Sequence, residues 1–156
     1  MRVAVITAST PIYRGQEEDA SGKVIRHILE EAGHDIVFQK ALPCDKTELS
    51  TVMQRMVDGE LADLILTTGG AGCAAGDCMP EATMEIVDRP VPGIPEAMRA
   101  YTSQMTKRAM LNRSAAGIRG NVLIVNLPGK PGAAKHCLEY ILPEITHAVK
   151  LIQKQV

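Results

Sequence analysis

Residues 64–83 read LILTTGGAGCAAGDCMPEAT, an apolar run followed by a glycine-rich turn, one acid and the start of a helix. Glycines permit positive φ angles and let a ligand approach the backbone closely. Exposed N–H groups in such a turn bind anions, and ligands of open α/β sheets sit where strands end. Asp77 falls at that place. The stretch therefore predicts a phosphate-binding loop with Asp77 beside a magnesium ion.

A purely structural turn also fits this spacing. The stretch contains neither the G-x-x-x-x-G-K-[ST] pattern of P-loops nor the G-x-G-x-x-G pattern of dinucleotide-binding folds. In the structural alternative the glycines make a tight strand-to-helix turn and Asp77 is a helix-start residue. Both interpretations stay open on spacing alone.

Size and composition favour a single globular domain of 156 residues. Aromatic residues make up 3% of the chain and the formal net charge is −1. Neither a base-stacking surface nor a basic field for nucleic acid or membrane is therefore expected. No apolar run approaches the length of a membrane span or a signal sequence. We expect a cytoplasmic protein that binds small molecules.

The cysteines are Cys44, Cys73, Cys78 and Cys137. Cys73 and Cys78 are five residues apart in the glycine loop, which is not the C-x-x-C spacing of zinc or redox motifs. Reduced thiols that bind no metal are the favoured interpretation. A thiol site formed by Cys73 and Cys78 is the alternative.

Short apolar runs alternate with amphipathic segments along the chain. Strands are predicted at residues 2–8, 35–41, 62–67 and 121–127, and helices at 24–32, 46–57, 80–87, 94–107 and 133–155. The last helix is expected to be interrupted near Pro143, and residues 13–19, 89–93 and 112–120 are expected to be loops. This alternation predicts an α/β fold with a mostly parallel sheet, in one domain over residues 1–156.

Two glycine-rich turns follow the third and fourth predicted strands, at residues 69–72 and 128–132. If these strands are neighbours in the sheet, both turns line one crevice.

Several segments, in order along the chain, resemble motifs of the molybdopterin-binding Mog/MoaB family. They are EDASG at 18–22, TTGGAG at 67–72, Asp77 with PEAT at 80–83, PGIPEAMR at 92–99, AMLNRSAAGIRG at 109–120, and NLPGKP at 126–131. The resemblance covers about residues 3–151, which is nearly the whole chain.

The resemblance implies a three-layer α/β/α domain that assembles as a homotrimer or hexamer. It implies molybdopterin as a ligand. For the Mog branch it implies a reaction in which molybdopterin and Mg²⁺-ATP give adenylyl-molybdopterin and pyrophosphate, with possible hand-over to a molybdate-insertion enzyme. Such a reaction brings several negative charges together, so catalysis depends on positioning and charge neutralisation.

The resemblance also implies roles for single residues. It assigns Asp77 and Asp45 to magnesium and catalysis, Gly69, Gly70, Gly72, Pro128 and Gly129 to the ligand crevice, and Glu96, Arg113 and Ser114 to substrate binding. Arg113 would clamp a phosphate, Ser114 would donate a hydrogen bond, and Glu96 would accept hydrogen bonds from pterin N–H groups.

Each charged residue also has a structural alternative. Asp77 and Asp45 are suited to capping the helices that follow them. Glu96 complements the dipole of its helix, and Arg113 is explained equally well as a solvated surface charge.

The chain departs from the family pattern at Ala71, Ala75, Gly76 and Cys44, where a hydroxyl or charge is missing. These departures keep a second interpretation open, a family member that binds molybdopterin without adenylylating it. The enzyme is the favoured interpretation, because Asp77 is present.

Overall fold

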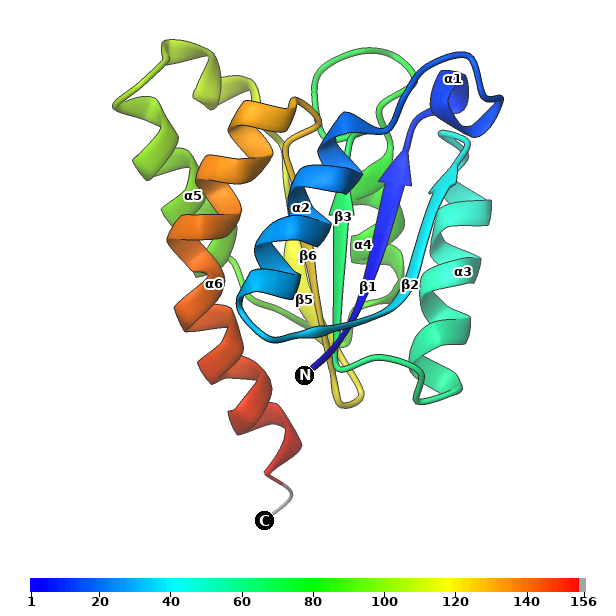
Figure 1. Cartoon of the computed structure of the whole chain (residues 1–156), viewed down its shortest axis with the longest axis vertical. Helices are drawn as coiled ribbons and strands as arrows, with labels where there is room; N and C mark the ends of the chain where they lie inside the picture. Colours follow the sequence, from blue (N-terminus) through cyan, green and yellow to red (C-terminus); the bar gives the residue numbers. More distant parts are fainter. Residues whose placement is uncertain (155–156) are drawn as a thin grey trace.

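A six-stranded sheet forms the middle layer of the computed structural model, which describes residues 1–154 (Figure 1). Its strands are β1 (Arg2–Ala8), β2 (Asp35–Leu42), β3 (Leu64–Thr68), β4 (Arg89–Pro90), β5 (Ala116–Arg119) and β6 (Val122–Leu127). The order is β2-β1-β3-β6-β5-β4, with β1, β2, β3 and β6 parallel and the pairs β4–β5 and β5–β6 antiparallel. The predicted α/β fold with a mostly parallel sheet is confirmed.

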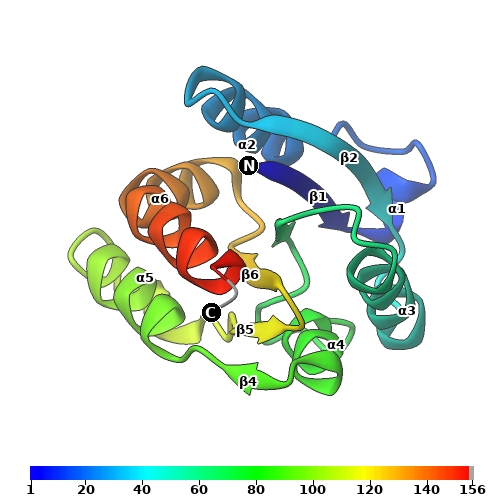
Figure 2. The same ribbon diagram turned by 90° about the horizontal axis from the view of Figure 1, so that it is seen from below.

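Helices cover both faces of this sheet. They are α1 (Thr10–Tyr13), α2 (Ala20–Glu31), α3 (Lys46–Asp58), α4 (Met79–Ile86), α5 (Gly93–Ser103), the 3-10 helix η1 (Lys107–Leu111) and α6 (Pro131–Gln153). In Figure 2, α2, α5 and α6 lie on one side of the sheet and α3 and α4 on the other, so the three-layer prediction is confirmed. Within residues 1–154, no helix combines the length and apolar character that crossing a membrane requires.

The central strands read as continuous apolar runs because both faces of the sheet are covered. In β1, Val3 and Val5 face the layer of α2, α5 and α6, whereas Ala4 and Ile6 face the layer of α3 and α4. β3 and β6 alternate in the same way. The two resulting cores fix the strand register and hold the strand ends, where the glycine turns begin, in place.

The structure corrects the sequence prediction in four places. Residues 116–119 form β5 and residues 89–90 form β4, although both segments were predicted as loops. The helix predicted at 94–107 ends at Ser103, and η1 follows it. The interruption predicted near Pro143 is wrong, because α6 continues through this residue. The predicted end of that helix, Gln155, lies outside the described residues.

Pro143 is tolerated because Ile141 and Ile145, on either side of it, are both buried in the core. Their packing outweighs the one backbone hydrogen bond that a proline removes from a helix.

Candidate functional site

The two glycine turns pack against each other at the carboxyl ends of β3 and β6, which are adjacent and parallel. Gly69 and Gly70 have φ angles of 87° and 70°, which only glycine adopts readily. A Cβ on Gly69 would lie 2.5 Å from the carbonyl oxygen of Ala8, and one on Gly129 would lie 3.2 Å from the Cα of Gly69. The two predicted turns are therefore neighbours, as the adjacency of β3 and β6 requires.

Hydroxyl groups fasten the second turn to its neighbours. Thr68, at the end of β3, donates a hydrogen bond to the carbonyl of Pro128 at 2.7 Å. Ser21, buried near the start of α2, donates to the carbonyl of Gly129. The second turn is therefore held on two sides, and its backbone is pre-organised for a ligand.

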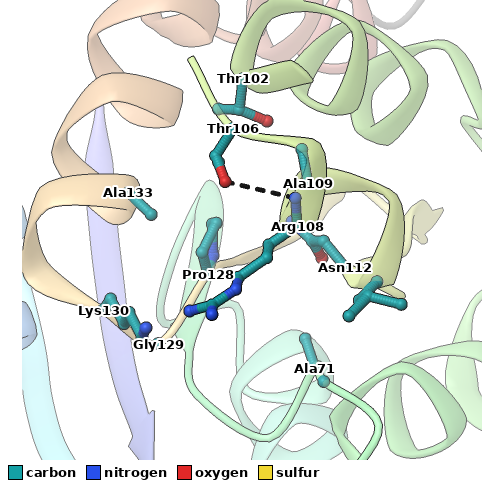
Figure 3. Close-up of a pocket in the computed structure, with 12 residues that line it drawn as sticks. Ala71, Thr102, Thr106, Arg108, Ala109, Asn112, Pro128, Gly129, Lys130 and Ala133 are labelled. Atoms are coloured by element: carbon teal, nitrogen blue, oxygen red, sulfur yellow. Dashed lines mark hydrogen bonds between the residues drawn. The ribbon is translucent and has the colours of Figure 1, made fainter. Parts of the chain in front are cut away.

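A pocket of about 390 Å³ opens beside these turns (Figure 3). Its lining comes from the glycine loop, the end of α5, η1, the second turn and the start of α6. The residues are Ala71, Gly72, Thr102, Thr106, Arg108, Ala109, Leu111, Asn112, Pro128, Gly129, Lys130 and Ala133. The structure thus brings Gly72, Pro128 and Gly129 together, as predicted.

The pocket combines apolar walls with positive charge. Ala71, Leu111 and Pro128 supply apolar surface, whereas Arg108 and Lys130 supply cations. In the part of the chain that the structure describes, no carboxylate lines the pocket. Such a lining suits a flat or apolar body that carries a negatively charged group.

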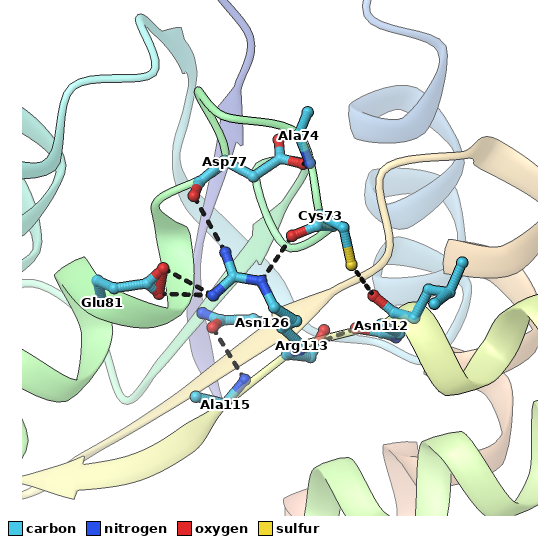
Figure 4. Close-up of polar contacts among 11 residues, drawn as sticks. Cys73, Ala74, Asp77, Glu81, Asn112, Arg113, Ala115 and Asn126 are labelled. Atoms are coloured by element: carbon cyan, nitrogen blue, oxygen red, sulfur yellow. Dashed lines mark hydrogen bonds and ion pairs between the residues drawn. The ribbon is translucent and has the colours of Figure 1, made fainter.

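Arg113 holds the glycine loop in shape (Figure 4). Its guanidinium donates from Nε to the carbonyl of Gly72 at 2.6 Å, from Nη1 to Glu81 at 2.7 Å, and from Nη2 to the carbonyl of Asp77 at 3.0 Å. The hydrogen bond that Arg113 donates to Glu81 is the largest cause of a raised pKa for Arg113. Most of the donors that a phosphate clamp would use are therefore already engaged.

The carboxylate of Asp77 turns back onto its own loop. It accepts a hydrogen bond from the N–H of Ala74 at 3.0 Å, and a Cβ on Gly72 would lie 2.9 Å from one of its oxygens. Gly72 thus lines the pocket and also leaves room for the Asp77 carboxylate. Asp77 itself does not line the pocket.

Asp45 caps α3 by accepting the N–H of Glu48 at 2.8 Å, in line with the structural alternative. The carboxylates of Asp45 and Asp77 both affect one thiol, that of Cys78. Burial is the main cause of the raised pKa of Cys78, and the charges of Cys44, Glu81, Asp45 and Asp77 add to it. Asp45 and Asp77 are thus both close enough to Cys78 for their charges to act on its thiol.

Carboxylate oxygens are among the ligands that Mg²⁺ takes in proteins, usually together with water and substrate phosphates. Within residues 1–154, no cluster of three His, Cys, Asp or Glu side chains forms an all-protein metal site. Neither Asp45 nor Asp77 is in an ion pair within those residues, and each carboxylate accepts one hydrogen bond. Oxygen lone pairs therefore remain on both groups for a metal.

Glu96 and Ser114 lie outside the pocket. Glu96 is exposed in the first turn of α5, whereas it is the far end of this helix, at Thr102, that reaches the pocket. Ser114 is 4% exposed, and its hydroxyl has no hydrogen-bond partner among the described residues.

The loop thiols have separate surroundings. Cys73 is exposed and donates to the carbonyl of Leu111 at 3.4 Å. Cys78 is half-buried and packs against the core beneath α3 and α4.

The sequence prediction missed the cations of the pocket. Arg108 stands between a predicted helix and a predicted loop, where a basic residue is usually interpreted as solvated surface. Lys130 lies inside the second predicted turn, and that position is the signal by which it could have been found. The pairing of the two needs the fold, because 22 positions separate residue 108 from residue 130.

Comparison with known proteins gives consistent matches along the chain. A family model described as a probable molybdopterin binding domain matches residues 4–147. A molybdopterin adenylyltransferase of Helicobacter pylori is 38% identical over 154 residues, which cover 97% of this chain and 88% of that protein. Molybdenum cofactor biosynthesis protein B of Bacillus subtilis is 33% identical and covers 99% of this chain and 91% of its own length.

A solved structure shows the same fold. The molybdopterin biosynthesis enzyme MoaB of Thermus thermophilus superimposes with a TM-score of 0.92 at 39% identity, over 99% of this chain and 97% of that one. The family model, the relatives and the structural match all extend across the sheet, the glycine turns and the pocket. The chain therefore belongs to the family of the probable molybdopterin binding domain, the Mog/MoaB family.

Proposed function

We propose that this chain transfers the adenylyl group of ATP to molybdopterin in molybdenum cofactor biosynthesis. An oxygen of the molybdopterin phosphate attacks the α-phosphorus of ATP, and the bond from that phosphorus to the β-phosphate oxygen breaks. The products are adenylyl-molybdopterin and pyrophosphate. The relatives named molybdopterin adenylyltransferase, 38% identical over nearly the whole chain, support this reaction.

The observation that carries the proposal is the pocket beside the two glycine turns. It offers apolar walls for a heterocycle and two cations for phosphate, and it borders Gly72, Pro128 and Gly129. Asp77 and Asp45 are not among the residues that line this pocket. In this proposal one substrate lies in the pocket and the other contacts the two acids.

Charge neutralisation is the main requirement of this reaction. We propose that Asp77 and Asp45 hold a magnesium ion together with ATP phosphates. When bound, the metal would withdraw negative charge from the phosphates. The Asp77 carboxylate is held for this role by the N–H of Ala74, and its loop is held by Arg113.

The remaining predicted contacts stay part of the proposal. Gly69 and Gly70 shape the crevice through their backbone, and Arg113 acts at the site mainly by holding the glycine loop. Ser114 has a free hydroxyl for a hydrogen bond among the described residues. Glu96 remains a proposed acceptor for pterin N–H groups, from its exposed place on α5.

We further propose that the functional domain spans residues 1–156, acts in the cytoplasm and assembles as a homotrimer or hexamer. In this proposal it passes its product to a molybdate-insertion enzyme. The family resemblance supports these points. Light scattering of the purified chain measures the assembly, and a monomer at working concentration would contradict it.

Single-turnover adenylylation tests the reaction. Purified protein is mixed anaerobically with molybdopterin, Mg²⁺ and α-labelled ATP, and labelled pterin adenylate is followed over time. We expect product with the wild type and a rate lower by about 100-fold or more with Asp77→Asn, because a lost metal ligand removes several kcal/mol of charge stabilisation. Asp35→Asn, the same change at an exposed residue of β2, is the matched control.

The outcomes separate the two interpretations of the family. Tight molybdopterin binding without product in the wild type would contradict the enzyme and favour the binding protein. Ala71 and Cys44, where the hydroxyl or charge of the family pattern is missing, would then be the first positions at which to restore the family residue. Wild-type rates in Asp77→Asn would contradict the role of Asp77 alone.

A further inference from the structure

The pocket has a strongly electropositive side formed by two elements that are distant in the sequence. Arg108 comes from η1 and Lys130 from the turn that precedes α6. In Figure 3 the Arg108 side chain reaches across the pocket, and its guanidinium end points toward Gly129 and Lys130. The backbone N–H of Arg108 is held by the hydroxyl of Thr106 at 3.2 Å, which fixes the start of this side chain.

The amino end of α6 adds to the same side. Lys130 is the N-cap residue of this 23-residue helix, and no side chain caps its free N–H groups. Pro131 occupies the first position, so the N–H groups of Gly132 and Ala133 are the first that lack partners within the helix. Ala133 also lines the pocket. Helix amino ends attract anions through these groups and through the helix dipole.

No acid of the described chain neutralises these cations. Neither Arg108 nor Lys130 is in an ion pair within residues 1–154. Arg113, by contrast, donates hydrogen bonds to Glu81 and to carbonyls of the glycine loop. The guanidinium of Arg108 therefore keeps its planar set of donors for a group that enters the pocket.

We propose that Arg108, Lys130 and the amino end of α6 bind a phosphate group of a substrate, and that Arg108 makes the pocket specific for the phosphorylated form. The identity of the substrates rests on the proposed function. The phosphate belongs either to molybdopterin or to ATP, since both present the same oxygen acceptors. A guanidinium and an ammonium that converge on one phosphate give short, charge-assisted hydrogen bonds.

The arrangement of the site favours the phosphate of molybdopterin. Ala71, Leu111 and Pro128 give the pocket apolar surface next to the cations, as a heterocycle with one phosphate requires. Asp45 and Asp77, the proposed partners of magnesium and ATP, lie outside this lining. We therefore expect the pterin to lie in the pocket and the ATP phosphates to lie near Asp77 and Asp45.

Binding measurements by calorimetry under anaerobic conditions test the assignment. The probes are molybdopterin, its phosphatase-treated form, and ATP with Mg²⁺. With Arg108→Gln we expect molybdopterin affinity to fall by about tenfold or more, because a charge-assisted contact to the phosphate is lost. Affinity for the dephosphorylated pterin should not change, because that ligand has no group for Arg108 to bind.

Lys107→Gln is the matched control. Lys107 is the neighbouring residue on η1, is exposed and does not line the pocket. Its replacement by Gln removes one positive charge, as Arg108→Gln does. Its affinities should equal those of the wild type. Lys130→Gln should resemble Arg108→Gln, and the double variant should lose less than the sum of both losses, because the two cations share one phosphate.

The measurements with the different probes identify which substrate carries the phosphate. They also test the phosphate site independently of the proposed reaction. A loss confined to molybdopterin assigns the phosphate to the pterin, and a loss confined to ATP assigns it to the nucleotide. Equal affinities of Arg108→Gln and Lys107→Gln for both ligands would overturn the proposal, even if the wild type makes pterin adenylate. An Arg108-dependent affinity without any product would leave the phosphate site standing and overturn the reaction.

Discussion

Asn126, inside β6, joins three other segments of the fold through one buried side chain. Its amide nitrogen donates to the hydroxyls of Thr67 at 2.9 Å and Thr83 at 2.8 Å. Its carbonyl oxygen accepts the N–H of Ala115 at 3.1 Å. Asn126 is 0% exposed, and the glycine loop lies between Thr67 and Thr83 in the sequence. This amide therefore ties both flanks of the loop to the central strand.

Asn126→Ala should lower the free energy of unfolding by about 3 kcal/mol, because three buried polar groups lose their partner and a small cavity remains. Urea unfolding followed by circular dichroism measures this loss, since the chain has no Trp. Asn121→Ala, in the exposed turn between β5 and β6, is the control and should change stability by less than about 0.5 kcal/mol. Equal effects of the two changes would contradict the role of the buried amide.

The two arginines near the pocket show that a sequence motif does not determine which side chain faces the pocket. The sequence places Arg113 in a family segment, and this segment is what suggested a phosphate clamp. In the fold, its guanidinium donates hydrogen bonds to Glu81 and to carbonyls of the glycine loop. Arg108, five positions earlier, faces the pocket instead. Which arginine faces a ligand depends on how η1 turns, and no spacing rule contains that information.

At the scale of elements, burial explains which strands were predictable. β1, β3 and β6 are buried along most of their length, so their apolar runs identify them. β4 is two exposed residues, one of them a proline, as is common at a sheet edge. β5 is four residues long and contains Gly117. Pairing with β6 stabilises β5, and the sequence of residues 116–119 alone does not predict this pairing.

α6 continues through Pro143 because tertiary packing outweighs the local tendency of proline to end a helix. A proline inside a helix removes one backbone hydrogen bond and crowds the preceding turn. Pro143 is exposed, whereas Ile141 and Ile145 beside it are buried at 4% and 0% exposure. Core packing therefore decides the course of the helix, and the proline lowers its stability.

Pro143→Ala should stabilise the protein by about 1–3 kcal/mol, because alanine restores the backbone donor and has the highest helix propensity. Thermal unfolding measures the change, with an expected rise in Tm of several degrees. Ala148→Ser, which lowers helix propensity on the same helix and puts a hydroxyl beside the core that Ala148 contacts, should lower Tm and is the reference for the opposite sign. An unchanged or lower Tm for Pro143→Ala would show that the surrounding turn depends on the proline.

At the scale of the whole molecule, strand order places the site. The chain passes from β1 outward to β2 and then returns to β3 on the other side of β1. Ligands of doubly wound sheets bind at such a reversal, outside the carboxyl ends of the strands. Gly69 packs on Ala8 at this point, between the ends of β3 and β1. The two turns were predictable from the sequence, and their contact depends on the strand order.

The opposite end of the sheet is held by an ion pair. Asp63 accepts hydrogen bonds from the backbone N–H of Arg2 at 2.7 Å and from its guanidinium at 2.8 Å. The carbonyl of Asp63 accepts the N–H of Leu123 at 3.2 Å. β1, β3 and β6 are thus joined at their amino ends by one residue, far along the sheet from the pocket.

This ion pair makes stability depend on pH. Burial alone would raise the pKa of Asp63, but hydrogen bonds from the side chain and backbone of Arg2 outweigh burial and lower the pKa overall. The folded state therefore binds a proton at Asp63 less readily than the unfolded state does. The stabilisation is complete above the unfolded pKa of about 3.9 and is lost as the pH falls through the lower folded pKa.

Asp63→Asn should therefore lower the free energy of unfolding by about 2 kcal/mol at pH 7, because hydrogen bonds to a charged group are replaced by weaker ones. The gap between wild type and variant should shrink as the pH falls below about 4, because the wild type then loses the same charge. Urea unfolding at a series of pH values measures this gap. Asp35→Asn, at an exposed acid, should stay close to the wild type throughout. A gap that is constant between neutral and acid pH would mean that Asp63 acts by packing, and that its charge contributes nothing to joining the three strands.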